Sequence, residues 1–159
     1  AAEYYRDQGH SVLFLFDSLT RFAEAHRETA LMAGETPALN AFPPSTVRVV
    51  SELAERTGPG TKAGGDITAI FSVLVAGSDF EEPVADMVRG ILDGHIVLSR
   101  KIAERGRYPA IDVLRSVSRA LPKAATEAQN STLQTYRQLM TTYDEIAPMV
   151  RAAVLRFHR

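Results

Sequence analysis

The sequence of 159 residues contains no cysteine, which excludes disulfide bonds, thiolate metal sites and a cysteine nucleophile. Its formal net charge of −1 gives no support to a general binder of nucleic acid or anionic lipid. No apolar run reaches the roughly 18–20 residues of a membrane-spanning helix, and no basic-then-apolar signal segment is present. With 45% apolar and 23% charged residues, the composition is typical of a globular protein with a hydrophobic core.

Catalytic motifs of several classes are also missing. None of the four scattered histidines pairs with another at the spacing of metal ligands, and no Gly-x-Ser-x-Gly elbow of a serine hydrolase occurs. Residues 58–65 are rich in glycine, but a Walker A loop requires Gly-Lys-Ser/Thr leading into a helix. Lys62 instead follows Thr61 and a strand is predicted next, so these residues predict a flexible surface connection. No other segment of the sequence offers a phosphate-binding loop.

Residues 1–9 have the pattern of the last turns of a helix that ends at Gly9. They include neither an initiator methionine nor an N-cap signal ahead of the helix. We therefore expect the chain to be a fragment of a longer protein.

Between residues 10 and 100, short apolar runs alternate with helical stretches, which is typical of βαβ units and a parallel sheet. Strands are predicted at residues 12–16, 67–75 and 95–99. The first is a continuous apolar run, so we expect it to be buried on both faces. Helices are predicted at residues 19–33 and 45–57, the second with Ser45 as its N-cap.

The composition changes after residue 100. Residues 101–119 are basic and mixed, with a turn or loop at 105–109. From residue 121 on, apolar residues recur at helical spacing, which predicts a helix over 126–146 and another that starts at Pro148. This last part of the chain is expected to be a small helical subdomain.

Asp17 directly follows the first predicted strand. A carboxylate at the carboxyl end of a buried parallel strand lies at the edge where open α/β sheets bind ligands. Because Mg²⁺ takes few protein carboxylates and keeps several waters, one aspartate there can hold the ion of a bound nucleotide. The pattern alone favours a plainer role, in which Asp17 or Ser18 caps the following helix.

A second candidate group consists of Tyr108, Arg115 and Arg119. A loop aromatic can stack on a base, and an arginine can stabilise charge on a transferring phosphoryl group. Taken alone, such residues are more often a packed tyrosine and a solvated or capping arginine.

Three stretches resemble the flagellar and type III secretion export ATPases, which are related to the catalytic subunits of rotary ATP synthases. Residues 11–23 look like the Walker B segment of that family, and residues 86–100 and 103–119 match two further family stretches. The resemblance implies an α/β fold, namely the second half of a RecA-like parallel-sheet ATPase core at 1–119. A small all-helical C-terminal domain would follow at 120–159.

The resemblance also implies roles for individual residues. Asp17 would orient Mg²⁺ through water, while Ser18 and Arg21 occupy positions that lie near the γ-phosphate of ATP in rotary relatives. Tyr108 matches a position that packs on adenine. Arg119 matches the arginine finger, which enters the neighbouring subunit's site and stabilises the negative charge of the transition state.

Two segments resemble loops that face the central shaft in rotary relatives. They are the acidic residues 76–83 and the proline-rich residues 36–45. Without the resemblance, both would be ordinary surface loops.

The implied function is ATP hydrolysis that drives flagellar or type III protein export, by a ring hexamer at the cytoplasmic face of the secretion apparatus. Expected partners are further copies of the chain, a central stalk protein, export-chaperone complexes and the export gate. Nucleic acid is not expected, and membrane association is peripheral at most. Because the family's phosphate loop and catalytic glutamate would precede residue 1, we expect the chain alone to hydrolyse ATP negligibly.

Two alternatives stay open on the sequence. The chain could be a non-catalytic interaction or regulatory module of a ring assembly, which a degraded phosphate loop in the parent protein would indicate. It could also be a rotary ATP synthase subunit, although residues 17–21 and the long match over 107–119 argue against that.

Overall fold

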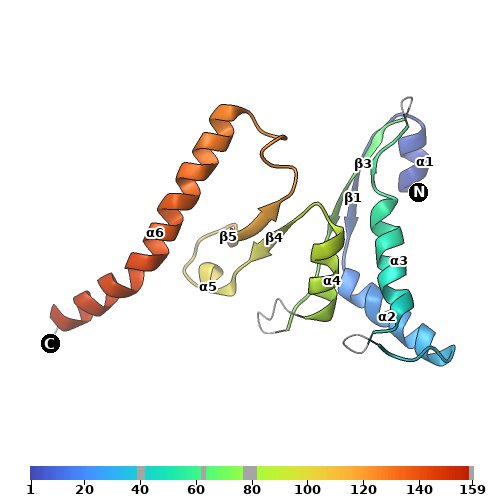
Figure 1. The fold of residues 1–159 in the computed structure, drawn as a ribbon, viewed down its shortest axis with the longest axis horizontal. Coiled ribbons are helices and arrows are strands. Elements are labelled where there is room, and N and C mark those ends of the chain that lie inside the picture. The colour runs from blue at the N-terminus through green and yellow to red at the C-terminus, as the bar shows by residue number, and fades with distance from the viewer. Residues whose placement is uncertain (39–41, 62–63, 77–81, 158–159) are drawn as a thin grey trace. The chain divides into compact units, whose positions relative to one another are not determined.

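The computed structural model describes residues 1–38, 42–61, 64–76 and 82–157, and for residues 151–157 it describes the backbone. The chain forms two compact units, unit 1 at Ala1–Leu92 and unit 2 at Asp93–Arg159. Each unit combines helices with a small β-sheet, so the chain is α/β as predicted (Figure 1).

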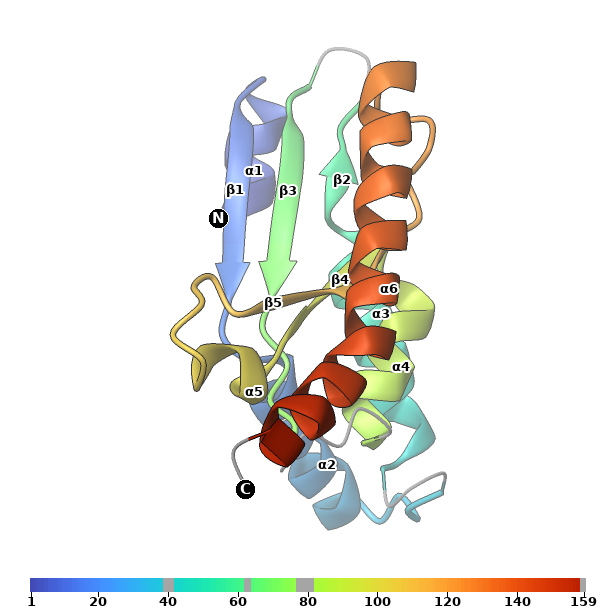
Figure 2. The same cartoon turned by 90° about the vertical axis from the view of Figure 1, so that its left-hand side faces the viewer.

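Unit 1 is built on two parallel strands. β1 (Ser11–Phe16) pairs with β3 (Asp66–Phe71), and the last residues, Phe16 and Phe71, lie opposite each other. A short strand, β2 (Gly58–Pro59), pairs antiparallel with the other edge of β3, which gives the order β1-β3-β2 (Figure 2). The predicted parallel pair is confirmed, although β3 ends before residue 75.

The helices of unit 1 in its described part are α1 (Ala2–Asp7), α2 (Leu19–Met32), α3 (Pro44–Glu55) and α4 (Pro83–Ile91). α1 ends as predicted, because Gly9 has a φ of 87°, in the left-handed region that favours glycine. α2 and α3 confirm the two helices predicted after the first strand.

The start of α3 differs from the prediction that Ser45 caps it. Pro43 is the N-cap residue and Pro44 the first helical residue, a position where a missing N–H is tolerated. The backbone N–H and the hydroxyl of Ser45 instead donate to the carboxylate of Glu35, at 3.0 and 2.5 Å. The Ser45 hydroxyl, and after it the Ser45 N–H, hold the pKa of Glu35 below its ordinary value.

The hydrophobic core of unit 1 is formed by side chains from α2, α3, α4 and the segment before α3. Its buried members are Leu19, Ala23, Phe42, Val50, Val84 and Val88. Phe16 and Phe71 pack against this cluster from the ends of the two parallel strands. This cluster therefore lies at the carboxyl end of the sheet, close to the last residues of β1 and β3.

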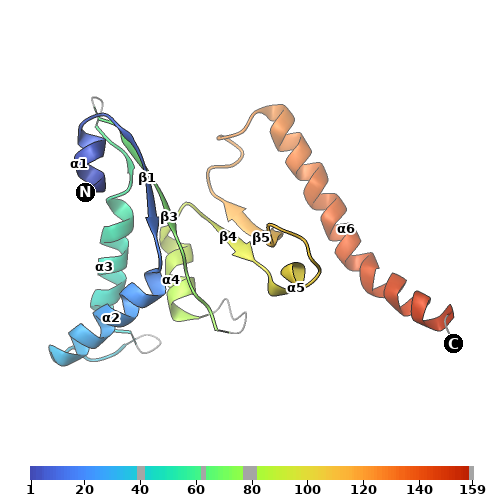
Figure 3. The same cartoon turned by 180° about the vertical axis from the view of Figure 1, so that it is seen from behind.

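The sheet of unit 1 is covered by helices on one face, and its opposite face is exposed (Figure 1). Leu13, Leu15 and Ile70 are largely exposed and alternate with half-buried residues, so the expectation that the first strand is buried on both faces is wrong for this structure. Figures 1 and 3 show α1 and α3 on the same side of β1 and β3. A sheet that is covered on one side gives this alternation, because successive side chains point to opposite faces.

Unit 2 begins with an antiparallel pair. β4 (Gly94–Leu98) and β5 (Ile111–Ser118) form a two-stranded sheet, and the short helix α5 (Arg100–Ala103) lies between them in sequence. β4 confirms the strand predicted at residues 95–99, but it pairs with β5 and not with the parallel sheet. β5 itself was not expected, since its apolar residues are interrupted by Arg115 and Ser116.

One helix, α6 (Glu127–Phe157), ends the described chain. It continues through Pro148, so the prediction of a separate helix starting there is wrong. A proline inside a helix removes one backbone hydrogen bond and favours a kink, but its neighbours Ala147 and Met149 are good helix formers. Among the described helices, none has the length and apolar character that a membrane crossing needs.

Candidate functional site

The carboxyl ends of β1 and β3 bring two polar residues together. Asp17 follows Phe16 and Ser72 follows Phe71, so each stands one position beyond a pair of opposite strand residues. The Ser72 hydroxyl donates a hydrogen bond to Oδ1 of Asp17. The Ser72 N–H donates to the Phe16 carbonyl at 3.0 Å. Asp17 thus stands at the edge of the sheet where open α/β folds bind ligands.

Ser18 caps α2. It is buried and extended, and its Oγ accepts a hydrogen bond from the Arg21 N–H at 3.3 Å. Of the two residues considered as the cap, Ser18 fills that role, while the Asp17 carboxylate accepts from Ser72. Arg21 lies exposed in the first turn of α2. Asp17, Ser18 and Arg21 therefore lie together at one end of β1.

The chemistry of this corner fits the Mg²⁺ ion of a bound nucleotide. Asp17 is exposed and offers a carboxylate, and Ser72 adds a neutral hydroxyl beside it. Nowhere in the described ranges do three His, Asp or Glu side chains gather as a metal cage. Mg²⁺ is commonly held by one or two carboxylates plus substrate phosphates and several waters, so a lone carboxylate suits it.

Residues 58–65 have a structural explanation in their described part. Gly58 and Pro59 form β2, and the Gly60 N–H donates to the Gly65 carbonyl at 2.8 Å. A Cβ on Gly65 would lie 1.9 Å from the carbonyl oxygen of His10, so the backbones approach too closely for a side chain. The expectation of a flexible connection is corrected to a partly paired segment, and Lys62 lies outside the described residues.

Tyr108 and Arg119 belong to unit 2, where they lie at opposite ends of the β4–β5 pair. Tyr108 is exposed in the turn between α5 and β5, near the hydrogen bond of 2.8 Å from the Ser99 N–H to the Ala110 carbonyl. Arg119 directly follows β5, and its N–H donates to the Asp93 carbonyl at 2.8 Å. Within unit 2, the structure does not bring the two residues together.

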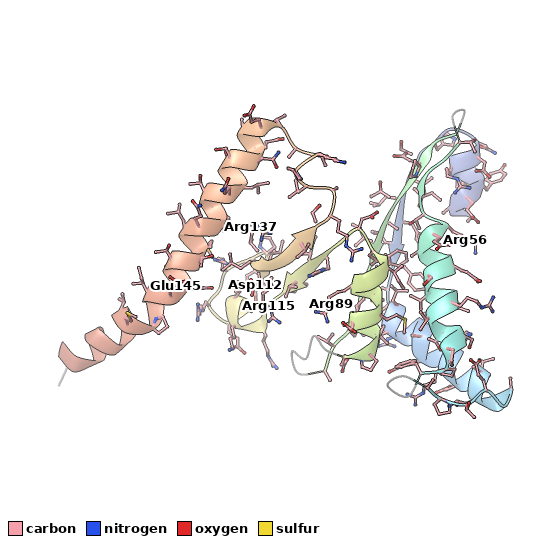
Figure 4. All side chains as sticks on the ribbon, viewed as in Figure 1. Arg56, Arg89, Asp112, Arg115, Arg137 and Glu145 are labelled. Atoms are coloured by element: carbon pink, nitrogen blue, oxygen red, sulfur yellow. The ribbon has the colours of Figure 1, made fainter. Side chains whose placement is uncertain are left out.

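A bulge in β5 precedes Arg119. The Val97 N–H donates to Oγ of Ser116 at 3.0 Å, and that hydroxyl donates to the Asp112 carbonyl at 2.6 Å. From α6, Nη2 of Arg137 donates to the Ser116 carbonyl at 2.8 Å, and Figure 4 shows Arg137 directed at this strand pair. A side-chain hydroxyl thus replaces a backbone acceptor, and α6 fixes the bulge from outside the sheet.

Ser72, Ser116 and Arg137 were not among the candidates that the sequence suggests. The sequence holds one signal for Ser72, a hydroxyl that interrupts the apolar run over residues 69–75. Ser116 and Arg137 are joined across 21 positions of the chain, and no local pattern links them. The two loops expected to face a central shaft fall partly on residues 39–41 and 77–81, which lie outside the described residues.

Comparison with known proteins identifies the family. The ATP synthase alpha/beta family, nucleotide-binding domain, matches residues 1–118. The chain is 46% identical over 149 residues to the flagellum-specific ATP synthase of Pseudomonas aeruginosa, covering 94% of this chain and 33% of that protein. It is 49% identical over 150 residues to the SPI-2 type 3 secretion system ATPase of Salmonella typhimurium, covering 94% of this chain and 34% of that protein.

A solved structure is also similar to this one. It is the assembled ATPase EscN in complex with its central stalk EscO, from the type III secretion system of enteropathogenic E. coli. The TM-score is 0.83 at 42% identity, and the match covers 94% of this chain and 35% of that chain. The likeness confirms the predicted fold class, an α/β fragment of a RecA-like ATPase core. The chain spans about a third of the length of these relatives, and it belongs to the ATP synthase alpha/beta family.

Proposed function

We propose that this chain is the Walker B part of an ATPase that hydrolyses ATP to drive flagellar or type III protein export. The observation that carries the proposal is the position of Asp17, at the carboxyl end of a parallel strand in a chain of this family. Two relatives, 46% and 49% identical over the matched 149 and 150 residues, are named as a flagellum-specific ATP synthase and a type 3 secretion system ATPase, which supports the same activity here.

In the proposed site, Asp17 orients the hydrated Mg²⁺ that accompanies ATP and neutralises developing negative charge on the phosphates. Ser18 and Arg21 lie beside it, near the γ-phosphate. Because Ser18 is buried and caps α2, it fixes the first turn from which Arg21 projects. The phosphate loop and the water-activating carboxylate come from another part of the protein, so the chain alone hydrolyses ATP negligibly.

We assign Tyr108 to adenine packing and Arg119 to the arginine finger that enters the neighbouring subunit's site. Their places at opposite ends of the β4–β5 pair support this division, because two residues so separated suit two different nucleotides. The finger adds positive charge where the transition state develops negative charge, which can raise turnover by about 10³-fold or more.

The proposed assembly is a ring hexamer around a central stalk at the cytoplasmic face of the secretion apparatus, where it receives export-chaperone complexes and works with the export gate. The similar solved structure, an assembled ATPase with its central stalk, supports the ring and the stalk. The proposed domain limits, a RecA-like part at 1–119 and a helical part at 120–159, place Arg119 at the junction.

Mixed assemblies of two inactive variants test the site and the ring together. We expect Asp17→Ala to abolish Mg²⁺-dependent ATP hydrolysis by the full-length protein. Arg119→Ala should keep ATP binding and lose turnover. When the two variants are mixed, about a quarter of the subunit interfaces pair an intact aspartate with an intact arginine, so some activity should return.

The mixture is informative because a cis arginine gives a different result. If Arg119 served the same subunit as Asp17, every subunit in the mixture would lack one of the two, and no activity would return. Loss of ATP binding in Arg119→Ala, equal to its loss of turnover, would also contradict the finger. Full Mg²⁺-dependent activity of Asp17→Ala would refute the proposed site itself.

A further inference from the structure

The Ser72 hydroxyl contacts Asp17, while backbone hydrogen bonds of Ser72 already join the strand ends. Its N–H donates to the Phe16 carbonyl at 3.0 Å, and its carbonyl accepts from the Leu19 N–H at 2.9 Å. These two bonds join the ends of β1 and β3 without the hydroxyl. The hydroxyl donates to Oδ1 of Asp17, and it also lies 3.5 Å from the Phe16 carbonyl, at the outer limit of a hydrogen bond.

An exposed aspartate that lacks such a partner has a loosely defined carboxylate orientation. The last torsion of an aspartate side chain is broad, so its two oxygens can rotate with little energetic penalty. A hydrogen bond to one oxygen removes that freedom and presents the other in a defined direction. Preorganisation of this kind matters most where the ligand, such as hydrated Mg²⁺, demands near-ideal octahedral geometry.

We infer that Ser72 is a positioning residue for Asp17, holding Oδ1 so that Oδ2 meets the water shell of the nucleotide's Mg²⁺. The inference rests on the proposed function, which gives Asp17 its role at the ion. Ser72 itself touches Asp17 and not the ion. Groups that orient metal-binding side chains in this way commonly change metal affinity or activity by about 10–100-fold when removed.

A nearby pair of hydrogen bonds provides a matched control. The Thr20 hydroxyl donates to the Leu74 carbonyl at 3.1 Å, and the Leu74 N–H donates back to Thr20 Oγ1 at 2.9 Å. The Thr20 hydroxyl thus joins α2 to the segment that follows β3, and both of these hydrogen bonds are with Leu74 and not with Asp17. Thr20→Val removes a hydroxyl at the same junction and keeps the volume of the side chain.

The experiment measures ATP affinity of the full-length protein by calorimetric titration, once with saturating Mg²⁺ and once with a chelator. Ser72→Ala should weaken binding about 10-fold with Mg²⁺ and leave the metal-free affinity unchanged. Ser72→Thr, which keeps the hydroxyl, should behave as the wild type. Thr20→Val should lower the melting temperature and leave the ratio of the two affinities unchanged.

Three outcomes would overturn the inference: an unchanged ratio in Ser72→Ala, an equal loss with and without Mg²⁺, or the same altered ratio in Thr20→Val. If Ser72→Ala does not fold, Ser72→Cys replaces it, and its weak donor should give an intermediate ratio. A wild-type ratio in Ser72→Cys would then overturn the inference. Asp17→Ala separates the two proposals. If Mg²⁺ no longer raises the ATP affinity of Asp17→Ala, but Ser72→Ala keeps the wild-type ratio of the two affinities, only the role of Ser72 is refuted.

Discussion

Unit 1 and unit 2 are stabilised in different ways. Unit 1 has a cluster of buried apolar side chains from three helices and the segment before α3, with the two phenylalanines that end β1 and β3 packed against it. In unit 2, Val97 is the buried apolar residue among the described side chains, at 7% exposed. Unit 2 is held together instead by hydrogen bonds, such as those of Ser116 with Val97, Asp112 and Arg137.

The long helix of unit 2 shows what this difference means. Apolar side chains recur along α6 at helical spacing, as the sequence predicts, and most of them are exposed: Leu133, Tyr136, Leu139, Tyr143, Ile146 and Met149. Unit 1 therefore buries one cluster of apolar side chains and leaves one face of its sheet exposed, while most apolar side chains of α6 in unit 2 are exposed. Apolar burial should accordingly dominate the stability of unit 1 and contribute little in unit 2.

The largest expected effect compares two leucines that differ in burial. Leu19 is 1% exposed in the core of unit 1, and Leu139 is 65% exposed on α6. We expect Leu19→Ala to lower the free energy of unfolding by about 2–5 kcal/mol, because it removes buried methyl groups and leaves a cavity. Leu139→Ala should stay within about 0.5 kcal/mol, and urea unfolding measures both. Equal losses would break the comparison between the units.

A smaller effect is expected where α6 meets the bulge of β5. Arg137→Ala removes the hydrogen bond to the Ser116 carbonyl, for which we expect a loss of about 1 kcal/mol. Amide exchange is the suitable measurement, because the Val97 N–H donates to Ser116 and should exchange faster in the variant. The Ser72 N–H in unit 1 is the internal control, and its exchange should not change.

The Glu35–Ser45 contact predicts a pH dependence in unit 1. The hydroxyl and then the N–H of Ser45 lower the pKa of Glu35 in the folded state. A lowered folded-state pKa adds stability above the unfolded-state pKa, and that stability is lost as the pH falls through the folded-state value. Glu35→Gln should therefore be less stable than the wild type near neutral pH, and the gap in melting temperature should close on acidification.

Ser45→Ala provides the matched variant for this pH series. It removes the hydroxyl and keeps the N–H that also donates to Glu35. Its melting temperature should therefore also lie below that of the wild type near neutral pH, by less than in Glu35→Gln. A gap that widens toward low pH in either variant would contradict the assigned direction.

The smallest effects should come from surface ion pairs, and they should be alike in both units. Arg48–Glu52 on α3 and Arg100–Glu104 near α5 are both i,i+4 pairs, at 3.0 and 3.4 Å. Double-mutant cycles should give about 0.3–0.5 kcal/mol for each. Clearly unequal coupling would mean that charge, and not only apolar burial, distinguishes the units.

The local features of this chain could be predicted from its sequence. The apolar run that ends at Asp17, the helix after it and the glycine that ends α1 all follow from neighbouring residues. The pairing of β4 with β5 could not be predicted, because the polar bulge at Arg115 and Ser116 hides the strand pattern. Pro148 misled the prediction for α6, since a proline marks a helix end more often than an interior position.

The candidate site likewise contains a local part that the sequence predicts and a long-range contact that it does not. Asp17, Ser18 and Arg21 form one local stretch, and the structure keeps them together at the end of β1. The hydrogen bond from Ser72 to Asp17 joins residues 55 positions apart, and it depends on the register of two parallel strands. Only the fold specifies that register, so the partner of Asp17 could not be found from sequence spacing.

The length of α6 has a geometric consequence. At 31 residues the helix measures about 46 Å, while a helix of about 20 residues already spans the diameter of a small domain. Arg137 contacts β5 from the first half of α6, so about 30 Å of helix follow that contact. Ile146 and Met149 lie on that stretch, and both are exposed to solvent.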